Sequence, residues 1–127
     1  MWAINYLTKP KFELPQLQDH VSEGTNTATS IGNYFSSMLD QSMNWKDAER
    51  LCSKWGGHFA LKGIMSVEDA KKAVDIGCTG IMVSNHGGRQ LDGSRAPFDQ
   101  LAEIVDAVGD KIDVICEGGI QRGTHIL

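Results

Sequence analysis

Apolar segments that read as strands alternate with amphipathic helical patterns through the C-terminal two-thirds of the chain. The expected strands are His58–Ile64, Thr79–Ser84 and Lys111–Glu117, and helical patterns separate them. Strands that alternate with helices form parallel sheets, and strands that are apolar on both sides require cover on both faces. The order helix–β–α–β–α–β–α therefore predicts an α/β fold, either a doubly wound sheet or a (β/α)₈ barrel.

Capping residues and glycines mark the bounds of the expected helices. Asn, Ser and Pro are favoured where helices begin, and glycine is favoured where they end. Apolar residues recur at helical spacing between these bounds, so each helix would pack one face against the sheet. The expected helices begin at Asn44, Ser66 and Pro97 and end at Gly56, Gly77 and Gly109, respectively.

The first third of the chain differs in character from the rest. Residues 1–44 predict an irregular loop or lid region with one short helix near Ile4, because prolines interrupt a polar, turn-rich stretch. Residues 45–127 predict the α/β part of the molecule. The pattern of a last helix is cut at Leu127, so we expect one truncated domain that is a fragment of a longer protein.

Charge and composition exclude several classes of protein. The formal net charge is −4 and no Lys/Arg-rich run occurs, so a nucleic-acid partner is not expected. No apolar stretch approaches the roughly 18 residues of a membrane helix. The N-terminus lacks the features of a secretory signal, so a cytoplasmic location is expected. The spacing of Cys52, Cys78 and Cys116 suits neither a disulfide framework nor a metal site, and predicts buried free thiols.

Polar side chains that could react lie at the C-terminal end of every expected strand. In α/β barrels and in open α/β sheets, the active site is built at that end of the strands. We therefore expect these side chains to share one rim of the sheet. Lys62 lies near the end of the first strand, Ser84, His86 and Arg89 follow the second, and Glu117 ends the third.

The loop that follows the second strand combines a base with an anion-binding group. His86 can act as a base near neutral pH, and Arg89 can hold a carboxylate through two parallel hydrogen bonds. This pair suits chemistry on the carbon next to a carboxylate. The alternative is an ordinary capping loop with a surface histidine and a surface arginine.

Two further features indicate an anionic or electron-rich ligand. Lys62 interrupts an apolar strand, either as a fixed cation beside developing negative charge or as a side chain that reaches into solvent. Gly118 and Gly119 form a turn before an expected helix, which is a natural phosphate cradle, and Arg122 adds positive charge. The last strands of an α/β barrel are the usual place for such a phosphate site.

The segment Ser84–Gly93, Ser-Asn-His-Gly-Gly-Arg-Gln-Leu-Asp-Gly, resembles the active-site stretch of the FMN-dependent L-2-hydroxy acid dehydrogenases and oxidases. The resemblance extends to Leu61–Ile64, Ser94–Pro97 and Gly118–Gly123, and it is strong from residue 58 to residue 127. It implies a partial (β/α)₈ TIM barrel of about three βα units, preceded by the irregular region. It also implies that FMN is the cofactor.

The resemblance implies a role for each matching residue. His86 would take a proton from the substrate, Arg89 would bind the substrate carboxylate, and Lys62 would stabilise reduced flavin at its N1/O2 edge. The family usually has Asp where this chain has Glu117, so the extra methylene could shift a contact to the cofactor. The residues that would bind FMN are Lys62, Ser84, Glu117, Gly119 and Arg122.

The implied reaction is the oxidation of an L-2-hydroxy acid, with L-lactate favoured, to the 2-oxo acid. The electron acceptor could be a quinone, a cytochrome or oxygen. Family members are often homotetramers, and some are peripheral to the inner membrane. The alternatives are another FMN-dependent TIM-barrel enzyme and a non-catalytic partial barrel. Because three strands leave open sheet edges, the isolated chain is expected to be inactive.

Overall fold

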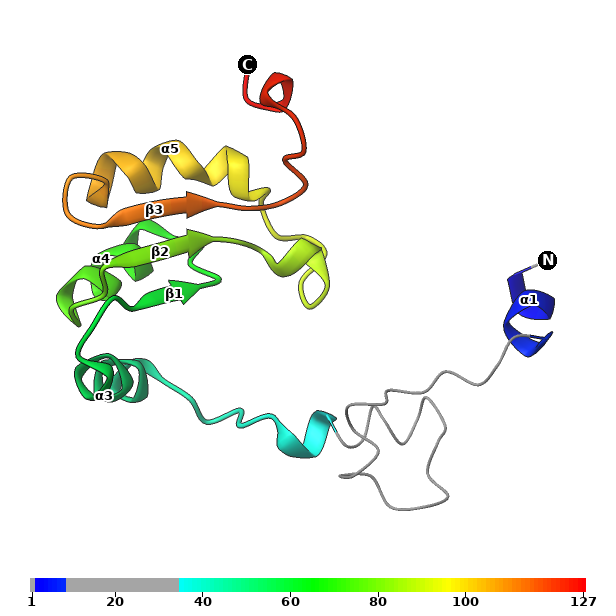
Figure 1. The fold of residues 1–127 in the computed structure, drawn as a ribbon, viewed down its shortest axis with the longest axis horizontal. Coiled ribbons are helices and arrows are strands. Elements are labelled where there is room, and N and C mark those ends of the chain that lie inside the picture. Colours follow the sequence, from blue (N-terminus) through cyan, green and yellow to red (C-terminus); the bar gives the residue numbers. More distant parts are fainter. Residues whose placement is uncertain (1, 9–34) are drawn as a thin grey trace. The chain divides into compact units, whose positions relative to one another are not determined.

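In a computed structural model of the chain, residues 2–8 and 35–127 are described (Figure 1). The chain divides into two compact units, Met1–Met43 and Asn44–Leu127, and each is considered by itself. In the first unit, helix α1 (Trp2–Thr8) confirms the short helix expected near Ile4. Residues 35–38 are also helical. Most of the expected loop or lid region lies outside the described residues.

The second unit alternates helices and strands as its sequence predicts. Helix α3 (Trp45–Trp55) begins at a capping box, in which Asn44 Oδ1 accepts a hydrogen bond from Lys46 N at 3.0 Å and Asp47 Oδ2 accepts one from Asn44 N at 3.2 Å. The elements that follow are β1 (Ala60–Lys62), α4 (Val67–Asp75), β2 (Gly80–Val83), η2 (His86–Gly88), α5 (Pro97–Val108), β3 (Asp113–Cys116) and η3 (Gly123–His125).

The strands form one parallel sheet in the order β1–β2–β3, with β2 at its centre (Figure 1). Leu61 of β1 pairs with Ile81 of β2, and Ile81 pairs with Val114 of β3. The strands therefore end at the same edge of the sheet. Strand β1 is shorter than expected because the chain turns at Gly63, whose φ of 94° is a conformation that favours glycine.

The hydrophobic core lies between the sheet and helices α4 and α5. Ile81 and Val83 alternate along β2, so both point to the same face, and both are fully buried. They pack in one cluster with Ile104 and Val108 of α5 and with two alanines of α4, Ala70 and Ala73. Burial of large aliphatic side chains is the main favourable term for such a layer, at about 25 cal/mol per Å² of apolar surface.

Described residues cover only one face of the sheet, so cover on the other face stays a prediction for the longer protein. Lys62, Met82 and Ile115 are aligned in register on the face opposite the core. The side chain of Lys62 is 52% exposed, and Ile115 is 46% exposed. The physical reason is that α4 and α5 both pack on the side of Ile81 and Val83.

The segment after β3 also departs from expectation. It forms a single 3₁₀ turn, η3, where an α-helix was expected. Residues 121–127 are all exposed, so no packed side chain stabilises a longer helix there. Within residues 2–8 and 35–127, no helix is both long and apolar enough to cross a membrane.

Candidate active site at the carboxyl ends of the strands

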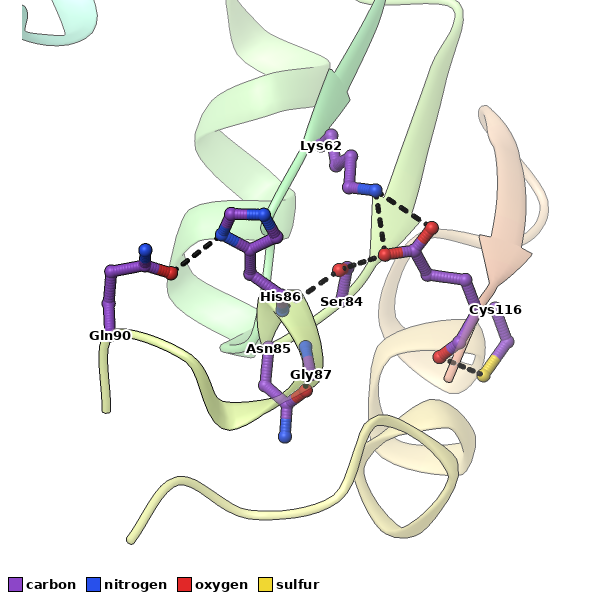
Figure 2. Close-up of polar contacts among 8 residues, drawn as sticks. Lys62, Ser84, Asn85, His86, Gly87, Gln90 and Cys116 are labelled. Carbon is purple, nitrogen blue, oxygen red and sulfur yellow. Dashed lines mark hydrogen bonds and ion pairs between the residues drawn. The ribbon is translucent and has the colours of Figure 1, made fainter. Parts of the chain in front are cut away.

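The sheet brings Lys62, Ser84 and Glu117 together where its strands end. Figure 2 shows the side chains of Lys62 and Ser84 directed toward the same carboxylate. Lys62 is the last residue of β1, Ser84 follows β2, and Glu117 follows β3. Lys62 Nζ lies 2.7 Å from Glu117 Oε1 and 2.8 Å from Oε2. Ser84 Oγ donates a hydrogen bond to Glu117 Oε1. Residues from different strands therefore meet on one carboxylate, as the shared rim predicts.

These contacts set the charge state of Glu117. The hydrogen bond from Lys62 lowers the pKa of the Glu117 carboxyl below its ordinary value, and the bond from Ser84 lowers the pKa further. Glu117 is therefore ionised at neutral pH and carries a full negative charge beside the Lys62 ammonium. The lysine does reach toward solvent, as one reading of the sequence expects, but it does so as one partner of an ion pair.

His86 is held by its backbone in an unusual conformation directly after Ser84. Its φ is 56°, in the left-handed region that side chains other than glycine seldom adopt, and its N–H donates to Ser84 Oγ at 3.1 Å. Asn85 Oδ1 accepts a hydrogen bond from Gly87 N at 3.0 Å and closes the turn. A strained residue of this kind persists only where its surroundings fix it, and such residues gather at functional sites.

The ring of His86 is oriented by Gln90, a residue that the sequence reasoning missed. His86 Nδ1 lies 2.6 Å from Gln90 Oε1 (Figure 2). Because the amide oxygen is an acceptor, the tautomer that makes this hydrogen bond carries its hydrogen on Nδ1 and leaves the lone pair on Nε2. Nε2, the nitrogen that can take up a proton, therefore has no hydrogen-bond partner among the described residues. The four-residue spacing between His86 and Gln90 is the signal that could have suggested the contact.

Arg89, Gly119 and Arg122 are not part of this contact cluster. Both guanidinium groups are exposed, and within the described residues neither pairs with a carboxylate. Gly119 has a φ of 81°, and nothing lies within 4 Å of the position that a side-chain carbon would take there. The positive charges of both arginines and the open backbone at Gly119 are therefore available to an anionic ligand.

A second network, also missed, ties the loop after β2 to helix α5. Arg95 Nη1 donates to Gln100 Oε1 at 2.9 Å and to Glu103 Oε1 at 2.8 Å. Asn85 Nδ2 donates to the backbone oxygen of Arg95 at 3.3 Å. The loop that carries His86 is thus attached at its far end to the helix that packs on the core. Within the described residues, no group of three or more His, Cys, Asp or Glu side chains could hold a metal ion.

The sequence of residues 2–127 matches the family model described as FMN-dependent dehydrogenase. The chain belongs to this family. An L-lactate dehydrogenase of Caulobacter sp. (strain K31) is 37% identical over 126 residues, which is 99% of this chain and 33% of that protein. An FMN-dependent alpha-hydroxy acid dehydrogenase of Schizosaccharomyces pombe is 54% identical over 85 residues, which is 67% of this chain and 21% of that protein.

A solved structure agrees with these sequence matches. The crystal structure of the monotopic membrane protein (S)-mandelate dehydrogenase is 32% identical and has a TM-score of 0.71 with this chain. The alignment covers 97% of this chain and 32% of that protein. The relatives in this family are thus oxidoreductases that are named for 2-hydroxy acids. The chain covers at most about a third of the length of each of these relatives.

FMN is the cofactor of the family, and the residues at the rim fit it. A flavin offers carbonyl and ring-nitrogen acceptors along one edge, which the Lys62 ammonium can address, whereas the single hydroxyl hydrogen of Ser84 is already donated to Glu117. Its phosphate requires backbone N–H groups and a cation. Arg122 supplies a cation that pairs with no carboxylate among the described residues, and Gly119, with a φ of 81° and nothing within 4 Å of its Cβ position, supplies a backbone that an anion can approach closely. The chemistry of the donors therefore suits FMN.

Proposed function

We propose that this chain is part of a (β/α)₈ barrel and contributes to the FMN-dependent oxidation of an L-2-hydroxy acid to the 2-oxo acid. The observation that carries the proposal is the placement of His86 Nε2. No described residue forms a hydrogen bond with Nε2, and the loop that carries it also carries Arg89, which pairs with no carboxylate in residues 2–8 and 35–127. A base beside a carboxylate-binding cation suits removal of hydrogen from the carbon next to a carboxylate.

The residues of the chain divide the work in this proposal. Arg89 binds the substrate carboxylate through two parallel hydrogen bonds and thereby fixes the position of the neighbouring carbon. His86 takes up, at Nε2, the proton that the substrate releases. Bound FMN would supply the acceptor for the two electrons and the second hydrogen that the substrate loses.

The cofactor is held along the carboxyl ends of the strands. Lys62 supplies positive charge at the edge of the flavin ring, and Ser84, whose hydroxyl hydrogen goes to Glu117 in this structure, supplies its oxygen as an acceptor. Gly119 and Arg122 hold the phosphate through backbone N–H groups and a guanidinium. Glu117 belongs to the same rim, but its carboxylate is already bound to Lys62 and Ser84.

The favoured substrate is L-lactate, which the name of the Caulobacter relative supports. The electron acceptor that suits the reaction is a quinone, a cytochrome or oxygen. A homotetramer is proposed for the whole protein, as expected from the family that the sequence resembles. A cytoplasmic protein peripheral to the inner membrane is consistent with the monotopic membrane relative.

The experiment uses the protein purified as the cell makes it. Its visible spectrum is recorded anaerobically before and after addition of L-lactate, with D-lactate as the control. We expect the yellow flavin band to bleach with L-lactate and to persist with D-lactate. A protein that carries no flavin would overturn the proposal in favour of a non-catalytic partial barrel. A flavin that no 2-hydroxy acid bleaches would favour another FMN-dependent barrel enzyme.

A further inference from the structure

The ion pair between Lys62 and Glu117 joins two strands that do not pair with each other. Strands β1 and β3 lie on either side of β2, and Glu117 reaches across to bring both carboxylate oxygens within 2.8 Å of Lys62 Nζ. No other carboxylate among the described residues contacts Lys62. The positive charge of Lys62 is therefore matched one to one by Glu117.

Glu117 is also held from a second side. Ser84 donates to Glu117 Oε1, is 2% exposed, and accepts the hydrogen bond from His86 N. A buried hydroxyl with partners on both sides fixes the carboxylate in place, because a carboxylate that moved away would leave Ser84 without its acceptor. Glu117 therefore remains beside Lys62 as a fixed negative charge.

We propose that Glu117 is the counter-ion of Lys62, and that it limits the positive charge that Lys62 presents to the flavin. This inference rests on the proposed function and deepens it. Glu117 acts through Lys62 and is a positioning residue, in place of the direct contact with FMN that its position in the motif implies. Its consequence is a lower reduction potential of the flavin than an unpaired lysine would give.

The size of the effect follows from the geometry. An isolated ammonium at the flavin edge favours the extra negative charge of the reduced ring, whereas an ammonium with a carboxylate 2.7 Å away acts mainly as a dipole, whose field falls off faster. Water screens both charges, because the side chains are 52% and 38% exposed. Removal of the carboxylate charge is therefore expected to favour reduction by about tenfold.

The test measures the two-electron midpoint potential of bound FMN in the purified protein and in its Glu117→Gln variant. The amide keeps an oxygen that can accept from Ser84 and removes the negative charge. We expect the potential to rise by about 30 mV, the equivalent of a tenfold change for two electrons. The dissociation constant of FMN should stay within about threefold, since the residue does not bind the cofactor directly.

A matched control comes from the pair between Lys72 and Asp69 on α4. Its N–O distance is 3.1 Å and its side chains are 52% and 41% exposed, close to the values for Lys62 and Glu117. Asp69→Asn removes the same charge from a pair in the helical layer, so it should leave the potential unchanged. Glu117→Asp shortens the side chain by one methylene and so withdraws the carboxylate from Lys62. This variant should raise the potential by less than Glu117→Gln does. It also provides a test if the Glu117→Gln variant does not fold.

Three results would overturn the inference. The potential could stay unchanged or fall in both Glu117 variants, Asp69→Asn could raise it equally, or FMN affinity could drop more than tenfold, which would make Glu117 a direct ligand. The potential is measured by chemical reduction, so the test does not depend on the substrate. A wild-type protein without FMN would instead overturn the proposed function, and the inference with it.

Discussion

His86 Nδ1 lies 2.6 Å from Gln90 Oε1, so the histidine that carries the proposed chemistry is oriented by a neighbour on its own loop. The contact fixes which ring nitrogen bears the hydrogen, and it leaves Nε2 to the substrate. Orientation of the base by a local residue explains how a strained, exposed loop can present a histidine in one defined tautomer.

Substitution of Gln90 by Met removes the acceptor for Nδ1 while it keeps the length of the side chain. We expect kcat for L-lactate oxidation to fall about fivefold, since the contact is one hydrogen bond of about 1 kcal/mol. Gln90→Glu, which keeps an acceptor oxygen, is the control and should retain more activity than Gln90→Met. Equal kcat values in Gln90→Met and the wild type would show that the contact does not orient the base.

Arg89→Met tests the binding of the substrate carboxylate. Loss of a charge-assisted pair of hydrogen bonds should lower kcat/KM for L-lactate by about 10- to 100-fold, mainly through a higher KM. FMN content, read from the visible spectrum, should not change. Full activity in Arg89→Met would point to a substrate without a carboxylate and hence to a different FMN-dependent barrel enzyme.

The Glu117 carboxyl predicts a pH dependence of stability. Its pKa is held below the ordinary value of 4.5 by the hydrogen bonds from Lys62 and Ser84. A lowered pKa in the folded state stabilises that state above the unfolded value, and the stabilisation is lost as pH falls through the folded value. The Tm of wild type should therefore exceed that of Glu117→Gln at pH 7, and the difference should shrink as the pH falls below the ordinary value of 4.5 toward the lowered pKa of the folded state. A constant difference from pH 7 to pH 3 would contradict the assignment.

Ile104→Ala tests the core that supports the rim. Ile104 is fully buried between α5 and β2, so the cavity should lower the free energy of unfolding by about 2–5 kcal/mol in urea titrations. Val105→Ala, on the same helix but 42% exposed, is the matched control and should change it by at most about 0.5 kcal/mol. Similar losses in both variants would mean that α5 does not pack as described.

Local signals in the sequence predict most of the secondary structure. Asn44 and Ser66 are the caps of α3 and α4, because capping depends only on residues a few positions away. The apolar pattern of residues 58–64 overestimates the extent of β1, which is Ala60–Lys62. The turn at Gly63 depends on the contact of the chain with β2 and not on the apolar pattern. The helix expected after β3 is absent for a similar reason, because packing of a helical face decides whether a short helix forms.

The sequence predicts where the site lies in the fold, but it does not predict which side chains contact each other there. That Lys62, Ser84 and Glu117 share a rim follows from the alternation of strands and helices. The ion pair between Lys62 and Glu117 joins residues 55 positions apart and depends on the register of three strands, which the sequence pattern does not define. The contact with Gln90 depends on the left-handed φ of His86, which is set by the fold around it.

The most direct test of the central claim is the rate at which L-lactate reduces bound flavin in the wild type and in His86→Gln, measured anaerobically by stopped flow. If His86 is the base, the variant retains FMN and its reduction rate falls by about 10²- to 10⁴-fold. If the variant reduces its flavin at the wild-type rate, His86 is not the base, and the proposed role of the loop after β2 is wrong.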